Sequence, residues 1–162
     1  MASILFVCTA NRFRSPIAAL YFAREVVRHG DDDRVTVSSA GTWGVSGMPA
    51  MPKAVQLAKQ YDLNLSYHRS QVVSEDILSN ADLILVMASG HKEAITHEFP
   101  ATRGRVFLLT EAVGKQPVDI LDPYGEAHAP PEHVIKDIID LIDGGYRQLI
   151  ILALKIKSKR TQ

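Results

Sequence analysis

Short apolar runs alternate along this chain with longer segments that have one apolar face, and this alternation limits the folds open to it. Strands are predicted at residues 4–7, 35–38, 83–87 and 105–109, and helices at residues 16–29, 52–61, 91–98 and 132 to about 157. The consecutive glycines Gly144 and Gly145 allow an interruption in the last helix. Strands separated by helices predict a parallel sheet, and hence an α/β fold. We expect one three-layer domain over residues 1–162, with a four-stranded parallel sheet and helices on both faces.

The composition excludes several classes of protein. Lys+Arg and Asp+Glu both total 18, so no net charge favours nucleic acid or an anionic membrane. The single cysteine, Cys8, cannot form an internal disulfide or a zinc-type cysteine pair, which suits a reducing compartment. No signal peptide and no apolar run long enough to cross a bilayer is evident. We therefore expect a cytoplasmic protein, either a monomer or a weak homo-oligomer.

A polar loop follows the first predicted strand and leads directly into a helix. In "VCTANRFRSP" the strand ends near Cys8, Ser15 is a suitable N-cap and Pro16 a suitable first helical residue. A helix N-terminus attracts anions, and the N–H groups of the preceding residues can face one centre. Asn11 tolerates the left-handed conformation that such a turn requires. Arg14 adds a planar fork that matches two phosphate oxygens. The loop is thus predicted to bind a phosphate group.

Cys8 would lie at the base of this loop. An arginine and a helix N-terminus favour the thiolate form of a cysteine, and a hydroxyl from Ser15 would stabilise it further. A thiolate held there can attack phosphorus and form a phosphocysteine that water later hydrolyses, with no metal or cofactor. Taken alone, a buried cysteine at a strand end is usually inert, and only the surrounding pattern favours the catalytic interpretation.

The reaction also needs an acid to protonate the leaving group. The leading candidate is Asp122 in "DILDPYGEA", a proline-rich loop before the last helix. Pro123 keeps Asp122 out of helical conformation. Asp119 is a second possibility, three residues earlier.

These motifs resemble those of the low-molecular-weight protein tyrosine phosphatases over nearly the whole chain. The family pattern V-C-x5-R-S-P corresponds to residues 7–16, and its D-P-[YF] loop to residues 122–124. Between them "SAGTW" (39–43), "YHRS" (67–70) and "LILVM" (83–87) are similar to family landmarks in the same order.

The resemblance implies a role for each matching residue. Cys8 is expected to be the nucleophile, Arg14 the phosphate clamp, and Asp122 the general acid and later the base. The phosphate-binding residues would be Thr9, Ala10, Asn11, Arg12, Phe13 and Ser15. Ser39 and His68 would complete the hydrogen-bond network of the loop, and Trp43 and Tyr124 would line the substrate cleft. The expected substrate is a phosphotyrosine protein or a small aryl phosphate.

Four positions depart from the family pattern. Phe13 replaces the second cysteine that many members carry, so Cys8 cannot be protected by a disulfide. Arg12 occupies a place where related phosphoarginine phosphatases have a small residue, which argues against that activity. Ala88 replaces an acidic residue that supports the acid loop in many members, and Gly125 replaces a second tyrosine.

Other functions are weaker interpretations. A thioredoxin-coupled arsenate reductase needs further cysteines that this chain lacks. A phosphate-binding or phosphoprotein-binding module without turnover stays possible, since only an assay separates it from an enzyme. A metal hydrolase built on His128, Glu132 and His133 is disfavoured because Pro130 and Pro131 prevent one helical face from presenting them. The C-terminal "KIKSKR" is interpreted as a solvated basic helix end.

Overall fold

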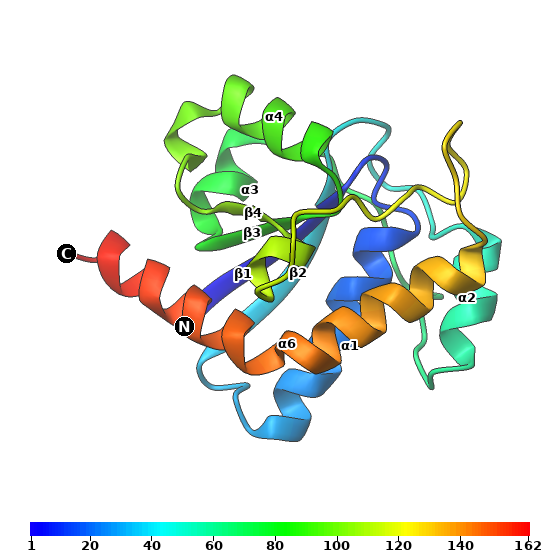
Figure 1. The fold of residues 1–162 in the computed structure, drawn as a ribbon, viewed down its shortest axis with the longest axis horizontal. Coiled ribbons are helices and arrows are strands. Elements are labelled where there is room, and N and C mark those ends of the chain that lie inside the picture. The colour runs from blue at the N-terminus through cyan, green and yellow to red at the C-terminus, as the bar shows by residue number, and fades with distance from the viewer.

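The computed structural model describes residues 1–162 and contains one four-stranded parallel sheet in the order β2-β1-β3-β4. The four strands are β1 (Ala2–Cys8), β2 (Val35–Gly41), β3 (Leu83–Val86) and β4 (Val106–Leu108). β1 is central and pairs with β2 on one side and with β3 on the other (Figure 1). The α/β fold with a four-stranded parallel sheet is confirmed.

Helices cover both faces of the sheet (Figure 1). One face carries α1 (Arg14–His29), α2 (Pro52–Lys59) and the long α6 (Pro131–Arg160), and the other carries α3 (Glu75–Asn80) and α4 (Ser89–Glu98). The short α5 (Leu109–Ala112) follows β4 directly, and a 3₁₀ turn, η1 (Pro100–Thr102), follows α4.

The alternating direction of the side chains along β1 explains why both faces of the sheet are covered by helices. Ile4 and Phe6 join the larger apolar cluster under α1 and α6, whereas Leu5 and Val7 join the smaller cluster under α3 and α4. Because successive strand residues point to opposite faces, a strand that is apolar throughout needs a cover on each side. The sheet is therefore the middle layer of three.

The predicted elements differ from the observed ones at a few places. α3 and α5 were not predicted, because helices of six and four residues are too short to produce a periodic pattern. The predicted interruption at Gly144 and Gly145 is wrong, since α6 continues through both. A Cβ atom on Gly145 would lie 2.2 Å from Val113 Cγ1, so this glycine permits close packing without ending the helix.

The basic C-terminus is more than a solvated helix end. Arg160 Nη1 donates to Oδ1 of the buried Asp82 at 2.6 Å, and Asp82 Oδ2 accepts from the N–H of Ser3 at 2.8 Å. The end of α6 is thus tied to the start of β1 through one buried carboxylate.

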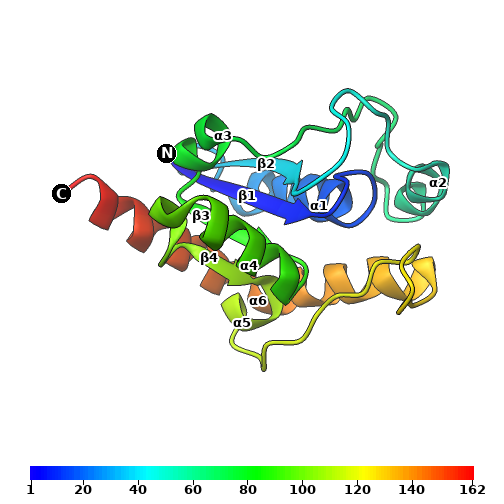
Figure 2. The ribbon, with the colours of Figure 1, turned by 90° about the horizontal axis from the view of Figure 1, so that it is seen from above.

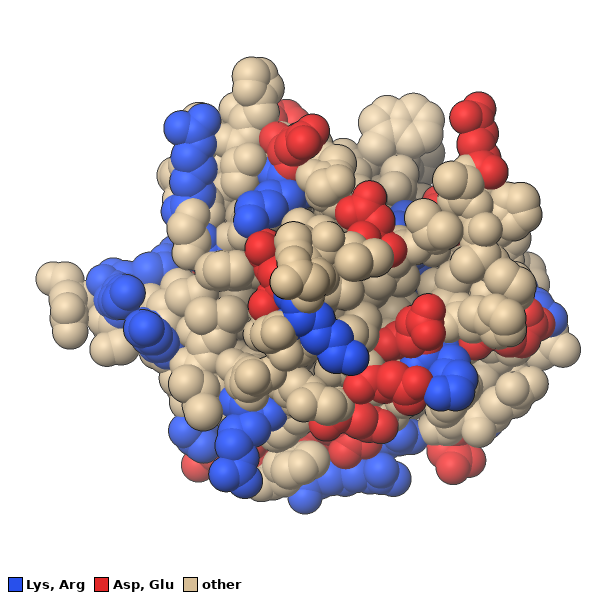
Figure 3. Space-filling view, in the orientation of Figure 1, with Lys and Arg blue, Asp and Glu red and all other residues tan.

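The loops that matter for function lie at one edge of the sheet. The loop after β1 and the long segment between α5 and α6 come together beyond the carboxyl ends of the strands (Figure 2). This is the edge at which doubly wound α/β proteins bind ligands. On the face seen in Figure 3, Lys and Arg side chains are interspersed with Asp and Glu side chains, apart from basic side chains at the C-terminal end. None of the helices combines the length and the hydropathy needed to cross a membrane.

Candidate active site

The loop between β1 and α1 presents its N–H groups without internal partners. None of the main-chain N–H groups of residues 9–13 donates a hydrogen bond within the protein. The carbonyl groups are held instead, because the oxygens of Cys8, Thr9 and Arg12 accept from the N–H groups of Thr42, Trp43 and Met51 at 2.8–3.0 Å. Unpaired N–H groups in a closed loop form an anion-binding nest.

Asn11 holds the loop in this shape from its centre. Its φ of 58° is left-handed, as the sequence predicted. The fully buried side chain donates from Nδ2 to Ser15 Oγ at 2.8 Å and to Ser39 Oγ at 2.9 Å. Its Oδ1 accepts from the N–H of Gln71 at 3.0 Å, and its carbonyl accepts from His68 Nε2 at 2.7 Å. The predicted contacts of Ser39 and His68 with the loop are therefore present.

The thiol of Cys8 has one hydroxyl group, that of Ser15, within hydrogen-bond distance. Cys8 is 3% exposed, and its Sγ lies 3.0 Å from Ser15 Oγ. Ser15 Oγ accepts from Asn11, so its own proton is directed to Cys8 Sγ or to the Ala40 carbonyl, 3.3 Å away. The prediction that Ser15 caps α1 is wrong: the helix begins at Arg14, and the hydroxyl is committed to this buried network.

Arg14 connects the loop to the segment that carries the candidate acid. It is 4% exposed, and its Nη1 donates to the Ile120 carbonyl at 2.8 Å. Its Nη2 lies 3.4 Å from Thr9 Oγ1 and 3.6 Å from Asp122 Oδ2. A guanidinium fixed on both arms keeps its planar fork in one orientation, which suits it to a planar array of phosphate oxygens.

The two candidate acids have different surroundings. Asp122 lies beside Arg14, and its Oδ1 accepts from the N–H of Tyr124 at 2.9 Å. Asp119 instead accepts from the N–H of Ser89 at 2.8 Å and so holds the N-terminus of α4. Only Asp122 lines the cavity above Cys8. Of the two carboxylates, Asp122 is therefore the one that lies beside Cys8 and Arg14.

A cavity of about 150 Å³ lies above the thiol. Its walls are formed by Cys8, Ala10, Arg12, Phe13, Arg14, Met51, Asp122 and Tyr124. The ring of Tyr124 packs edge-to-face on Phe13 at 5.9 Å and is 52% exposed, so it stands at the rim. Trp43 does not line this cavity, and its side chain is 76% exposed. The expectation that Trp43 forms a wall of the cleft is not met in this structure.

Arg12 lines the cavity and is hydrogen-bonded to a residue at its rim. Its Nε donates to the Pro49 carbonyl at 2.8 Å, and the side chain lines the cavity. It makes no ion pair with a carboxylate. The rim of the cavity therefore carries the positive charge of Arg12 in addition to that of Arg14.

Burial opposes the charged form of two histidines near the loop. Burial is the main cause that lowers the pKa of His68. Burial and then the charge of Arg14 lower the pKa of His91 to about 4. His91 Nδ1 accepts from the N–H of Ala88 at 3.1 Å, and Nε2 lies 2.9 Å from Thr9 Oγ1.

Several residues of the site could not be assigned from the sequence. A Cβ atom on Gly41 would lie 2.4 Å from the Thr9 carbonyl oxygen, so only glycine fits beside the loop. Gln71, His91 and Ile120 each contact the loop from distant parts of the chain. The family landmark "SAGTW" contained Gly41, but no local pattern pointed to the other three.

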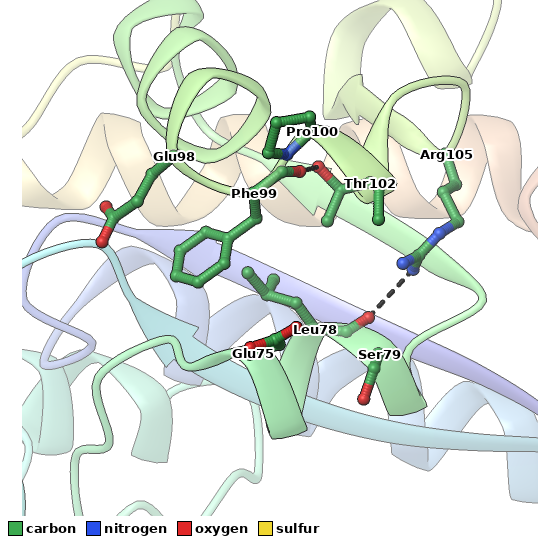
Figure 4. A pocket seen from close by; sticks show the side chains of 9 residues that line it. Glu75, Leu78, Ser79, Glu98, Phe99, Pro100, Thr102 and Arg105 are labelled. Carbon is green, nitrogen blue, oxygen red and sulfur yellow. Dashed lines mark hydrogen bonds between the residues drawn. The ribbon is translucent and has the colours of Figure 1, made fainter.

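A larger cavity, of about 350 Å³, lies between α3 and η1 and is a poor candidate for catalysis. Figure 4 shows the Arg105 guanidinium directed at the Leu78 carbonyl, 2.9 Å away, and it also bonds the Ala81 carbonyl. Arg105 thereby holds the C-terminal end of α3, and no nucleophilic cysteine lies there. No group of three or more His, Cys, Asp or Glu side chains is placed to hold a metal ion. Glu132 pairs with Lys53 at 3.1 Å, away from His128.

Comparison with known proteins places this geometry in a family. The family model described as low molecular weight phosphotyrosine protein phosphatase matches residues 3–161. A probable low molecular weight protein-tyrosine-phosphatase EpsP from Ralstonia nicotianae is 38% identical over 122 residues, which cover 75% of this chain and 78% of the relative. A protein-arginine-phosphatase from Bacillus subtilis is also 38% identical over 122 residues, covering 75% of this chain and 79% of the relative.

A solved structure supports the same assignment. The low molecular weight protein tyrosine phosphatase from T. tengcongensis superposes with a TM-score of 0.83 at 33% identity, covering 92% of this chain and 100% of that chain. The match in sequence extends over nearly the whole chain, and the match in structure covers 92% of it. The chain belongs to the low molecular weight phosphotyrosine protein phosphatase family.

Proposed function

We propose that residues 1–162 form one phosphatase domain that hydrolyses phosphotyrosine and aryl phosphate monoesters through a phosphocysteine on Cys8. The observation that carries the proposal is the loop of unpaired N–H groups that surrounds this thiol and ends at the Arg14 guanidinium. Such a cradle stabilises the charge on the equatorial oxygens of a phosphoryl group in transfer. Asp122 in the same cavity supplies the acid.

The reaction then has two balanced steps. In the first, the Cys8 thiolate attacks phosphorus, the bond between phosphorus and the aryl oxygen breaks, and Asp122 gives its proton to the leaving oxygen. In the second, the Asp122 carboxylate takes a proton from water, which attacks phosphorus while the bond to sulfur breaks. Inorganic phosphate and the thiolate result, and the Ser15 hydroxyl, 3.0 Å from Sγ, stabilises that thiolate.

The rim favours an aromatic substrate. Tyr124 stands half-exposed above the cavity with its ring fixed on Phe13, so it offers an aromatic surface to a phenyl ring that enters. The substrate class we propose is accordingly a phosphotyrosine protein or a small aryl phosphate. We further propose a cytoplasmic location, because the only cysteine needs a reducing environment, and a monomeric or weakly associated state.

Phosphoarginine is the competing substrate, because a relative named as a protein-arginine-phosphatase is as similar as the tyrosine phosphatase. Arg12 argues against it, since a second guanidinium at the rim repels the protonated guanidino group of such a substrate. Parallel assays with a phosphotyrosine and a phosphoarginine version of one peptide decide between the two.

The experiment that tests the proposal is hydrolysis of para-nitrophenyl phosphate by the wild type and by Cys8→Ser, with EDTA and a reductant present. We expect turnover by the wild type and none by the variant, because a serine hydroxyl is a far poorer nucleophile at neutral pH. The variant should still bind vanadate or phosphate, measured by calorimetry, because the N–H cradle and Arg14 are intact. Phosphate binding by a wild type that lacks turnover would favour a binding module, and arsenate reduction would favour the reductase.

A further inference from the structure

His91 is a buried titratable group that the reaction above does not use. It lies in the first turn of α4, is 7% exposed and comes within hydrogen-bond distance of the phosphate-binding loop. Its partners fix its tautomer. Nδ1 accepts the N–H of Ala88 at 3.1 Å and therefore carries no proton, so Nε2 carries the proton and donates it to Thr9 Oγ1 at 2.9 Å.

Thr9 connects His91 to Arg14, the proposed phosphate clamp. Its Oγ1 accepts from His91 Nε2 and also from Arg14 Nη2 at 3.4 Å. Both acceptor positions of the hydroxyl are then used, and its own proton is left for a third acceptor such as a phosphoryl oxygen held by Arg14. The other arm of Arg14 is held by the Ile120 carbonyl. The second arm has two partners, Thr9 Oγ1 at 3.4 Å and Asp122 Oδ2 at 3.6 Å. Thr9 is the hydrogen-bond acceptor of this arm, and His91 holds Thr9 in turn.

We propose that His91 is a positioning residue that orients the hydroxyl of Thr9 and, through it, the Arg14 guanidinium of the phosphate site. This rests on the proposed function. The ring stays neutral, and keeps its Nδ1 acceptor, because burial and Arg14 from α1 oppose protonation more strongly than Asp119 and Asp122 from the acid loop favour it. A charged imidazolium would lose the Ala88 bond and repel Arg14.

Two isosteric substitutions separate this role from simple capping of α4. His91→Asn places its carbonyl near the position of Nδ1, so it keeps the bond from Ala88 and loses the donor to Thr9. His91→Gln places its amide near the position of Nε2, so it keeps the donor to Thr9 and loses the bond from Ala88. A capping role predicts that Asn substitutes for His91, and the positioning role predicts that Gln does.

The experiment measures kcat and KM for a phosphotyrosine peptide, Kd for vanadate, and Tm, for the wild type and both variants. We expect His91→Asn to lower kcat by about tenfold and to weaken vanadate binding, with KM changed less. His91→Gln should retain kcat to within about threefold. Thr9→Val should lose about as much as His91→Asn, and the double variant no more than either, because the two residues act as one unit. His97→Asn, on the exposed side of the same helix, is the matched control.

Full activity in His91→Asn, or losses that follow Tm in both variants, would overturn the positioning role. A wild type without turnover would instead contradict the proposed function. In that case the vanadate affinities still test His91, and ¹⁵N spectra of the ring test the Nε2–H tautomer without any activity. A ring protonated at Nδ1 would contradict the proposal by itself.

Discussion

The two loops that meet at the candidate active site are built in opposite ways. The loop between Cys8 and Arg14 is buried and bonded at its centre. Asn11 there and the adjacent Ser15 are fully inaccessible, and Asn11 bonds β2 and the segment between α2 and α3. The segment between α5 and α6 is exposed at Val118, Leu121 and Tyr124. Ile120 is one of its few buried residues, and its N–H donates to the Met87 carbonyl at 2.7 Å.

The difference in burial between the two loops matches the two tasks that the reaction requires, phosphate binding and proton transfer. A cradle for phosphate needs fixed N–H groups, because donors that do not reorganise stabilise developing charge most effectively. An acid that serves one partner and then another needs access to solvent and to the leaving group, which an exposed loop supplies. Arg14 joins the two, since it belongs to the first loop and bonds the second. Substitutions in the two loops should therefore have separable effects on stability and rate.

Within the exposed loop, the largest effect on rate without loss of stability is expected from Asp122→Asn. This substitution should lower kcat for phenyl phosphate by about 100-fold, and much less for para-nitrophenyl phosphate, because a good leaving group needs little protonation. A series of aryl phosphates of graded acidity, with urea unfolding in parallel, measures both quantities. Asp119→Asn is the control, since Asp119 holds α4 and does not line the cavity. Equal losses across the series would count against Asp122 as the acid.

In the cysteine loop, Asn11→Ala should cost stability as well as activity. The substitution removes three side-chain hydrogen bonds in a buried site, and we expect a loss of about 2 to 4 kcal/mol in the free energy of unfolding. Asp62→Ala isolates the backbone contribution, because Asp62 has the same φ of 58° but is exposed. That control should lose no more than about 1 kcal/mol. Similar losses in the two variants would mean that the side-chain network contributes little.

The smallest of the three effects is a pH dependence of stability that depends on His91, about 2 kcal/mol over the range from pH 7.5 to 5. Because the folded state lowers its pKa from 6.5 to about 4, the unfolded chain binds a proton in this range that the folded chain does not. Stability from this source is complete above pH 6.5 and declines as the pH falls toward 4, by roughly 3 kcal/mol in all. Urea unfolding between pH 7.5 and 5 should show a steeper decline in the wild type than in His91→Gln. Parallel curves would contradict this assignment.

Much of this architecture follows from short-range patterns. The strand core at residues 4–7, the helix after Pro16 and the left-handed Asn11 were predicted, because apolar runs, helix periodicity and the conformational preference of asparagine act locally. Cys8, Arg14 and Asp122 were named from a spacing and a loop, and the structure gathers all three around one cavity. The short helices α3 and α5 gave no such pattern, and the glycine pair in α6 gave a misleading one.

The sequence by itself determined the layered α/β fold and the chemistry that the cysteine loop can perform. Tertiary structure alone decided which distant groups hold that loop. Gln71 and His91 contact it from positions 60 and 82 residues away along the chain, and a single carbonyl, that of Ile120, fixes one arm of Arg14. It also decided that Ser15 faces the thiol rather than capping a helix, and that Trp43 faces solvent. The physical reason is that packing in three dimensions determines which groups come within hydrogen-bond distance. These groups can be far apart along the chain, so no local sequence pattern reveals them.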